Sequence, residues 1–60
     1  MIKTIYFSHP ELGIALRKAS DWLEQNNDVV EMDVIVSEIE GEFTKLREWL
    51  VRIYYYEGDL

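Results

Sequence analysis

A run of alternating residues in the middle of the chain constrains its fold more than any other feature of the sequence. From Val30 to Val36, apolar residues at every second position alternate with acidic residues and one isoleucine. Side chains of a strand point alternately to its two faces, so a period of two indicates a strand with one buried face. The sequence therefore predicts a strand over 29–39. Its expected core face carries Val30, Met32, Val34 and Val36.

The residues that follow predict that this strand turns back as a hairpin. Gly41-Glu42 fits a type II′ turn, which takes glycine first, so we expect a turn at 40–42 and a second strand at 44–56. In that register apolar residues face apolar residues and acids face bases, which cross-strand pairing favours. The expected pairs are Val34 with Trp49, Met32 with Val51, Val30 with Ile53, Glu31 with Arg52, and Glu38 with Lys45.

A second helix is the alternative for the last third of the chain, because apolar residues there also recur at helical spacing. These residues are Phe43, Leu46, Leu50 and Ile53. The register favours the strand, and so does Tyr54-Tyr55-Tyr56, since aromatic residues are enriched in strands. The polar residues 57–60 are expected to form a tail.

The first half of the chain predicts a strand followed by a helix. Residues 2–7 are rich in β-branched and aromatic side chains and predict a strand, with apolar residues on both of its faces. Ser8 and Glu11 fit a capping box, and Pro10 fits the first helical turn, so a helix is expected over 9–26. Its apolar stripe has helical spacing and consists of Leu12, Ala15, Leu16, Ala19, Trp22 and Leu23.

Together these elements predict an α+β protein, a single small domain over 1–60 with the element order β-α-β-β. The expected architecture is a three-stranded, mainly antiparallel sheet with one helix packed on one face. A chain of 60 residues buries only about 60% of its unfolded surface, and this chain contains no cysteine. Because disulfides are therefore excluded, oligomerisation is the common remaining way to stabilise so small a domain.

One helix can cover only one side of the expected sheet, so apolar residues on the other side would face water. Exposed apolar patches of that kind mark interfaces. The sequence therefore predicts a homo-oligomer, most simply a two-fold dimer. The residues expected to form this self-interface are Ile35, Leu50, Tyr54 and Tyr56.

The charge is strongly acidic and unevenly placed. Twelve acids against six bases give a net charge of −6, and residues 21–42 contain eight acids and no lysine or arginine. Direct binding of DNA or RNA needs the opposite charge and is not expected. Such a surface either keeps a small domain soluble or binds a basic protein partner. The partner-binding residues predicted for the second case are Glu31, Asp33, Glu38 and Glu40.

The sequence offers no constellation for catalysis, so an enzyme is not expected. Ser8 and His9 are adjacent, a spacing that rarely gives the geometry of a nucleophile and its base. Glu31 and Asp33, taken to share a strand face, could bind a cation, but a solvated strand face is the simpler interpretation. No catalytic residue, metal site or cofactor is predicted.

A small-ligand-binding or sequestering module is the second functional hypothesis. An aromatic sheet face with Trp49, Tyr54 and Tyr56 would then hold a planar molecule between two subunits. In either case a cytoplasmic location without membrane binding is expected. No signal peptide is evident at the start of the chain. No apolar run is close to the length of a membrane span, which is about 20 residues.

The order of these segments resembles a family of small sporulation proteins from spore-forming bacteria. The resemblance rests on Ile2-Lys3, the break after Phe7, the single helix, the segment 29–34 and the closing segment 50–55. It implies a protein of about this length with relatives among phage genes, and it brings no catalytic residues. With the acidic surface, it predicts a non-enzymatic interaction module. We expect a homodimeric regulator or inhibitor of a protein partner, which in one version imitates the charge of a nucleic acid.

Overall fold

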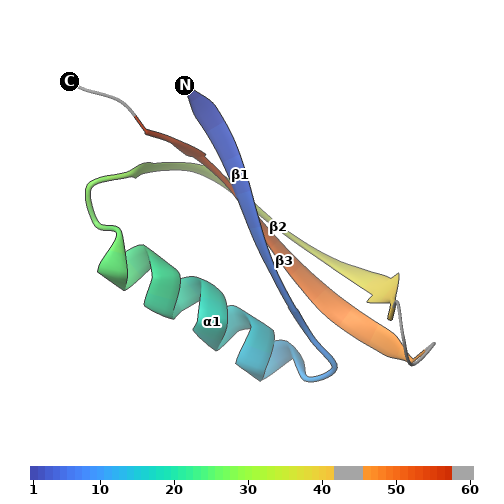
Figure 1. Ribbon diagram of the computed structural model, residues 1–60. Coiled ribbons are helices and arrows are strands. Elements are labelled where there is room, and N and C mark those ends of the chain that lie inside the picture. The colour runs from blue at the N-terminus through green and yellow to red at the C-terminus, as the bar shows by residue number, and fades with distance from the viewer. Residues whose placement is uncertain (42–45, 58–60) are drawn as a thin grey trace.

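The computed structural model describes residues 1–41 and 46–57, which form one helix and three strands. Figure 1 shows the helix beside a single antiparallel sheet, so the expected α+β class is confirmed. In chain order the elements are β1 (Ile2–His9), α1 (Leu12–Gln25), β2 (Val30–Glu40) and β3 (Arg47–Tyr56).

Several boundaries differ from the expected ones. β1 continues two residues beyond the expected strand 2–7, and β3 is a strand where a second helix was the alternative. The expected turn at 40–42, the start of the strand 44–56 and the end of the tail 57–60 lie partly outside the described residues.

The last strand of the chain is the central strand of the sheet. The strand order is β1-β3-β2, and β3 pairs antiparallel with both of its neighbours. Val51 and Ile53, which point to the same face of β3, are fully buried. Burying an aliphatic side chain of this size contributes about 1.5–3 kcal/mol, so β3 provides the centre of the core.

α1 packs on the side of the sheet to which the buried β3 residues point. Its own buried residues are Ala15 and Ala19, whose small side chains let the helix approach the sheet closely. Among the described residues, α1 contacts β1 and β3 but not β2. The core therefore lies between the helix and two of the three strands, and Ile5 and Phe7 identify the core face of β1.

The position of the helix shows that the expected core was partly wrong. Val34 and Val36 remain exposed because β2 is an outer strand that α1 does not reach, and Val30 is exposed because it points to the side of the sheet away from α1. Leu16, expected in the buried stripe of the helix, is 42% exposed, whereas Ile14 is partly buried. The side chain of Met32, the remaining expected core residue on this part of β2, lies outside the described part of the chain.

The expected capping box at the start of the helix does not form. β1 continues to His9, which pairs with Trp49, so α1 begins only at Leu12. The backbone N–H of Glu11 donates to His9 Nδ1 over 2.9 Å. An imidazole nitrogen thus satisfies a backbone donor beside the helix start, where the serine hydroxyl was expected to cap.

β2 and β3 also pair in a different register from the expected one. Val34 lies opposite Ile53 rather than Trp49, because the last pair of the ladder, Glu40 with Arg47, leaves a connection longer than a two-residue turn. The other described residues shift accordingly. Val30 lies opposite Tyr56, Glu31 opposite Tyr55, Ile35 opposite Arg52, Val36 opposite Val51, and Glu38 opposite Trp49. The expected partner of Glu38, Lys45, is outside the described residues.

A β-bulge between Glu31 and Asp33 changes which residues of β2 share a face. The bulge adds one residue to this strand, so the two acids pair with adjacent residues of β3 and point to opposite faces. They were expected to share a face. For the same reason Val30 points to the opposite face from Val34 and Val36.

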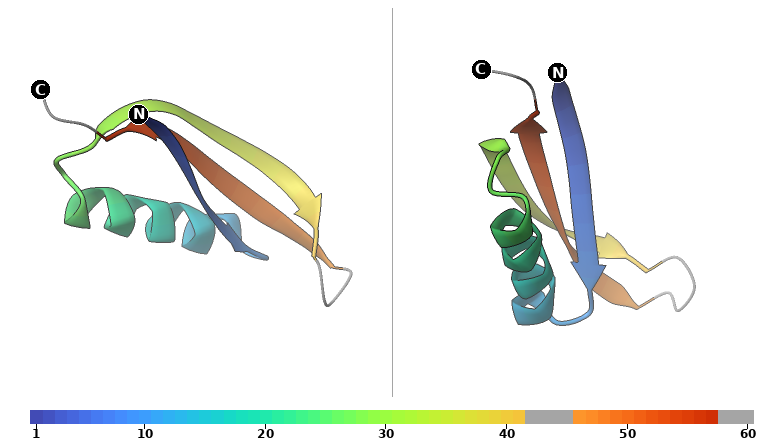
Figure 2. Two further views of the ribbon diagram at one scale, coloured as in Figure 1. Left: turned by 45° about the horizontal axis from the view of Figure 1, so that its top comes forward. Right: turned by 60° about the vertical axis from the view of Figure 1, so that its left-hand side comes forward.

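The molecule is elongated along the β2–β3 hairpin. Its extents are 42 × 19 × 16 Å and its radius of gyration is 12.5 Å, compared with about 10 Å for a compact chain of this length. In Figure 2 the paired ends of β2 and β3 run past both α1 and the end of β1. Much of the hairpin therefore projects from the core.

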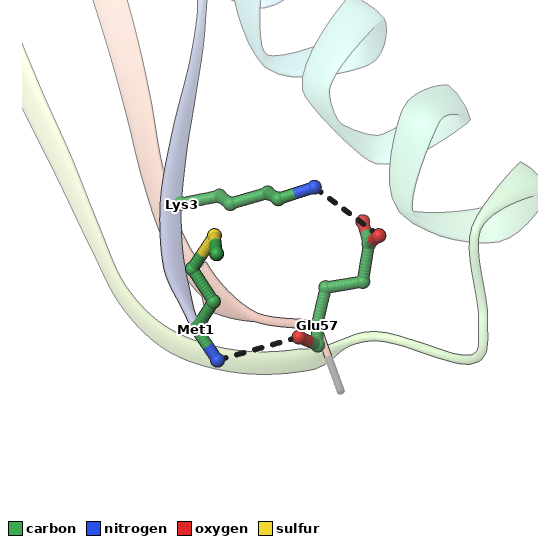
Figure 3. A network of polar contacts seen from close by, with 3 residues as sticks. All are labelled: Met1, Lys3 and Glu57. Atoms are coloured by element: carbon green, nitrogen blue, oxygen red, sulfur yellow. Dashed lines mark hydrogen bonds and ion pairs between the residues drawn. The ribbon is translucent and has the colours of Figure 1, made fainter. Parts of the chain in front are cut away.

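Glu57 joins the ends of β1 and β3 (Figure 3). The Met1 amino group donates to the Glu57 carbonyl oxygen over 3.4 Å, and the Glu57 N–H donates to the Met1 carbonyl over 3.2 Å. Lys3 Nζ lies 3.2 Å from Glu57 Oε1. Both side chains of this ion pair are largely exposed, so the pair adds at most about 1 kcal/mol to stability.

Candidate interaction surface

β2 exposes apolar side chains on both faces of the sheet. Val34 and Val36 point to the helix side and are 40% and 44% exposed, whereas Val30 and Ile35 point to the other side and are 48% and 45% exposed. A long apolar outer strand is a template for pairing with another chain. We call residues 33–37, with their outward-pointing backbone groups, the β2 edge.

The backbone groups that point outward from the β2 edge follow from the pattern of the ladder. The Gly41 N–H donates to the Leu46 carbonyl over 2.6 Å, which makes these residues a hydrogen-bonded pair. In an antiparallel ladder such pairs alternate with pairs whose backbone groups point away from each other. The N–H and C=O groups of Val34 and Val36 therefore point away from β3, along the outer side of the sheet.

The side of the sheet opposite α1 forms a second surface, which we call the open face. No described helix or strand covers it. Tyr6 is the most exposed large apolar side chain here, at 65%, and Ile2 is similar. The residues that the register places on this face are Ile2, Thr4, Tyr6 and Ser8 of β1, Glu48, Leu50, Arg52, Tyr54 and Tyr56 of β3, and Val30, Asp33, Ile35, Ser37 and Ile39 of β2.

All four residues predicted for the self-interface lie on the open face, but one of them is not accessible. Ile35 and Tyr56 are exposed and Tyr54 is partly buried. Leu50 is only 8% exposed, because it lies on the central strand with paired neighbours on both sides. The sequence pattern alone does not single out Tyr6, because its exposure follows from the position of β1 at the edge of the sheet.

The four acids predicted to bind a partner do not form one surface. Glu31, Glu38 and Glu40 lie on the helix side of β2, whereas Asp33 lies on the open face. All four are exposed. Glu38 Oε1 accepts a hydrogen bond from Arg47 Nε over 3.0 Å, so its charge is partly balanced. The three glutamates border the β2 edge at its two ends.

Arg52 brings a positive charge to the middle of the open face. Its partly buried side chain lies between Tyr6 and Ile35 in the register, and its Nη1 donates to the Tyr54 hydroxyl over 3.4 Å. Among the described residues it is the only base on this face. The open face thus combines apolar and aromatic side chains with Arg52 and with the acids Asp33 and Glu48.

The structure does not gather the aromatic residues of the ligand-binding hypothesis on one face. Trp49 packs against the core on the helix side, whereas Tyr54 and Tyr56 lie on the open face. Within the described residues there is no pocket and no group of three or more side chains able to hold a metal ion. The one described helix is too short and too polar to cross a membrane.

Comparison of the chain with protein-family models, with curated proteins and with solved structures found no match. The resemblance to small sporulation proteins therefore stays a prediction.

Proposed function

We propose that the protein is a cytoplasmic, non-enzymatic interaction module that works as a homodimer and regulates or inhibits a protein partner. The observation that supports this function best is the apolar surface left uncovered on β2 and the open face, above all Val34, Ile35, Val36 and Tyr6. Exposed apolar residues on an outer strand and on an uncovered sheet face are typical of sites of protein–protein contact.

The proposal assigns different surfaces to two contacts. Apolar residues of β2, which are exposed on both faces of the sheet, bind a second copy of the chain. The acids that border the β2 edge remain accessible and bind a basic partner, since opposite charges accelerate association and select the partner. In the most specific version of this proposal, the acids imitate phosphate charge and displace nucleic acid from a basic protein. A small regulator of this kind agrees with the resemblance to sporulation proteins and their phage relatives.

Light scattering on a sizing column, over a range of protein concentrations, tests the self-association. Ile35→Lys is compared with Leu16→Lys, because the two side chains are 45% and 42% exposed and the variants change the charge equally. We expect dimers for the wild type and for Leu16→Lys, and monomers for Ile35→Lys at concentrations where the wild type is dimeric. A monomeric wild type at every concentration would contradict this part of the proposal.

A charge-matched pair of variants tests the partner site. In the first, Glu31, Glu38 and Glu40 become Gln and Asp33 becomes Asn. In the second, the same chemical changes are made at Glu11, Glu24, Asp21 and Asp28, all outside β2. Each set removes four negative charges.

The readout for this pair is release of a fluorescent DNA duplex from a linker histone, followed by fluorescence anisotropy. We expect the wild type and the second variant to release the duplex and the first variant to lose most of this activity. Equal loss in both variants would show that net charge alone acts, and no release by the wild type would contradict charge mimicry.

A further inference from the structure

We infer that the β2 edge pairs antiparallel with the β2 edge of a second copy, in a register centred on Ile35. This inference rests on the proposed homodimer and specifies its interface. The result is a continuous sheet of six strands, three from each copy, in the order β1-β3-β2-β2-β3-β1. Its two-fold axis passes between the two Ile35 residues, and both helices lie on the same side.

The backbone of the β2 edge is already arranged for this pairing. The N–H and C=O groups of Val34 and Val36 point outward, as the Gly41–Leu46 hydrogen bond establishes. With Ile35 opposite Ile35, Val34 of each copy meets Val36 of the other as a hydrogen-bonded pair. Two such pairs satisfy all the outward-pointing groups of these two valines.

The side chains of the β2 edge complement themselves in the same register. Val34 meets Val36 twice on the helix side, and Ile35 meets its own copy on the open face. All three side chains are 40–45% exposed in the single chain, so each loses apolar surface on pairing. If the second copy slid by two residues, the register would be centred on Val36. Val36 would then lie opposite its own copy, but Val34 would lie opposite Glu38.

The charges of β2 are compatible with this register. Asp33 is the only acid of the β2 edge, and it lies opposite Ser37 of the second copy. No acid of these five residues faces another acid. A register centred on Glu38 would place the two copies of that glutamate directly opposite each other, which is destabilising.

β1, the other outer strand, fits a partner less well. Its residues on the helix side, Ile5 and Phe7, are already packed into the core. β1 spans 8 residues and β2 spans 11. Only β2 therefore presents exposed apolar side chains on both faces beside an outward-pointing row of backbone groups.

The elongated hairpin exposes more surface than a compact chain would. The accessible surface is 4652 Å², compared with about 4,100 Å² for a compact monomer of this mass. Part of this surface belongs to the exposed outer strand, where a second copy would bury it.

Two lysine variants distinguish edge pairing from stacking of two open faces. Val36 lies on the helix side of the β2 edge, whereas Tyr6 lies on the open face of the far strand. Under edge pairing, Val36→Lys raises the dimer dissociation constant at least about tenfold, and Tyr6→Lys leaves it within about twofold. The reverse result, measured by light scattering with folding checked by circular dichroism, would overturn the inference.

A disulfide between two copies tests the register. Ile35 and its copy form a non-hydrogen-bonded pair, in which the Cα atoms lie about 4.5 Å apart, within the range that a disulfide bridges. The chain has no cysteine of its own, so Ile35→Cys introduces the only thiol. Ser37→Cys is the matched control, because the two copies of residue 37 would lie more than about 13 Å apart.

We expect oxidised glutathione to convert most of Ile35→Cys, and little of Ser37→Cys, into the disulfide-linked dimer. If the wild type is dimeric but Ile35→Cys does not form the disulfide-linked dimer, the register is overturned and the proposed homodimer stands. A wild type that is monomeric at every concentration would overturn both the register and the proposed homodimer.

Discussion

The rings of Trp22 and Tyr55 pack against each other, with their centroids 4.9 Å apart and their planes inclined by 58°. Trp22 lies near the end of α1, and Tyr55 is a buried residue of the central strand. Tilted aromatic pairs at this distance contribute about 0.5–1.5 kcal/mol beyond the burial of their surface. This pair therefore joins the only described helix to the sheet at one end of the core.

The first prediction concerns this pair. Trp22→Ala should lower the free energy of unfolding by about 3 kcal/mol, the low end for such substitutions because Trp22 is only partly buried. That is a large part of the total stability of a 60-residue domain, about 3–9 kcal/mol. Trp22→Phe keeps a ring at this position and should lower the free energy of unfolding much less. Urea unfolding followed by circular dichroism, at one protein concentration, would show this, and equal losses would contradict the role of the ring contact.

The second prediction is that Gly13→Ala stabilises the protein. Gly13 lies in the first turn of α1, and a Cβ atom added there would meet no atom within 4 Å. Alanine lowers the backbone entropy of the unfolded chain without a new contact, so unfolding should become harder by about 0.5–1 kcal/mol. The urea midpoint should rise. A lower midpoint would show that this position needs glycine for another reason.

The third prediction follows from the contact between His9 and the Glu11 N–H. His9→Ala removes the acceptor of this 2.9 Å hydrogen bond and should destabilise the protein by about 1 kcal/mol. His9→Asn can restore an acceptor and should lose less. Ser8→Ala, which would remove the cap in the expected capping box, should have almost no effect. If Ser8→Ala costs more stability than His9→Ala, the serine rather than the histidine caps the helix.

The fourth prediction concerns salt. Each chain has a net charge of −6, and acids border the β2 edge at its two ends, so two copies repel each other at low ionic strength. Raising the salt from about 0.01 M to about 1 M shortens the screening length from about 30 Å to about 3 Å. The dimer dissociation constant, measured by sedimentation equilibrium, should therefore fall severalfold. A dimer that weakens with salt would indicate that opposite charges meet at the interface.

The local patterns predicted the elements more accurately than their arrangement. The alternation from Val30 to Val36 correctly indicated a strand, and the aromatic run at 54–56 correctly favoured a strand over a helix. Tyr55 lies in the core and Tyr56 outside, as a period of two requires. These features depend on neighbouring residues alone, so they can be read from the sequence.

The register and the strand order depend on contacts between distant residues. The predicted register was wrong, and the local patterns did not predict the strand order. Nothing in the local sequence marks the bulge between Glu31 and Asp33, which sends these acids to opposite faces. The position of β3 between β1 and β2 is likewise set by tertiary packing, and it places β2 beyond the helix. The exposure of Val34 and Val36, on which the candidate interface depends, follows from that strand order.

For the same reason the sequence indicated the face of the predicted interface residues better than their exposure. Ile35 and Tyr56 fall on the open face because their strands alternate as expected. Leu50 shares that face but is buried. Its low exposure depends on neighbours in two other strands, which a single segment of sequence does not reveal.

Amide hydrogen exchange at Val34 and Val36, measured by NMR on the wild type, tests the pairing of two β2 edges most directly. In a single chain these two N–H groups point to solvent, whereas that of Ile35 points to β3. The account predicts that both valine amides exchange slowly at high protein concentration and that their protection falls on dilution, while Ile35 stays protected. Fast exchange at Val34 and Val36 at every concentration, beside a protected Ile35, would contradict it.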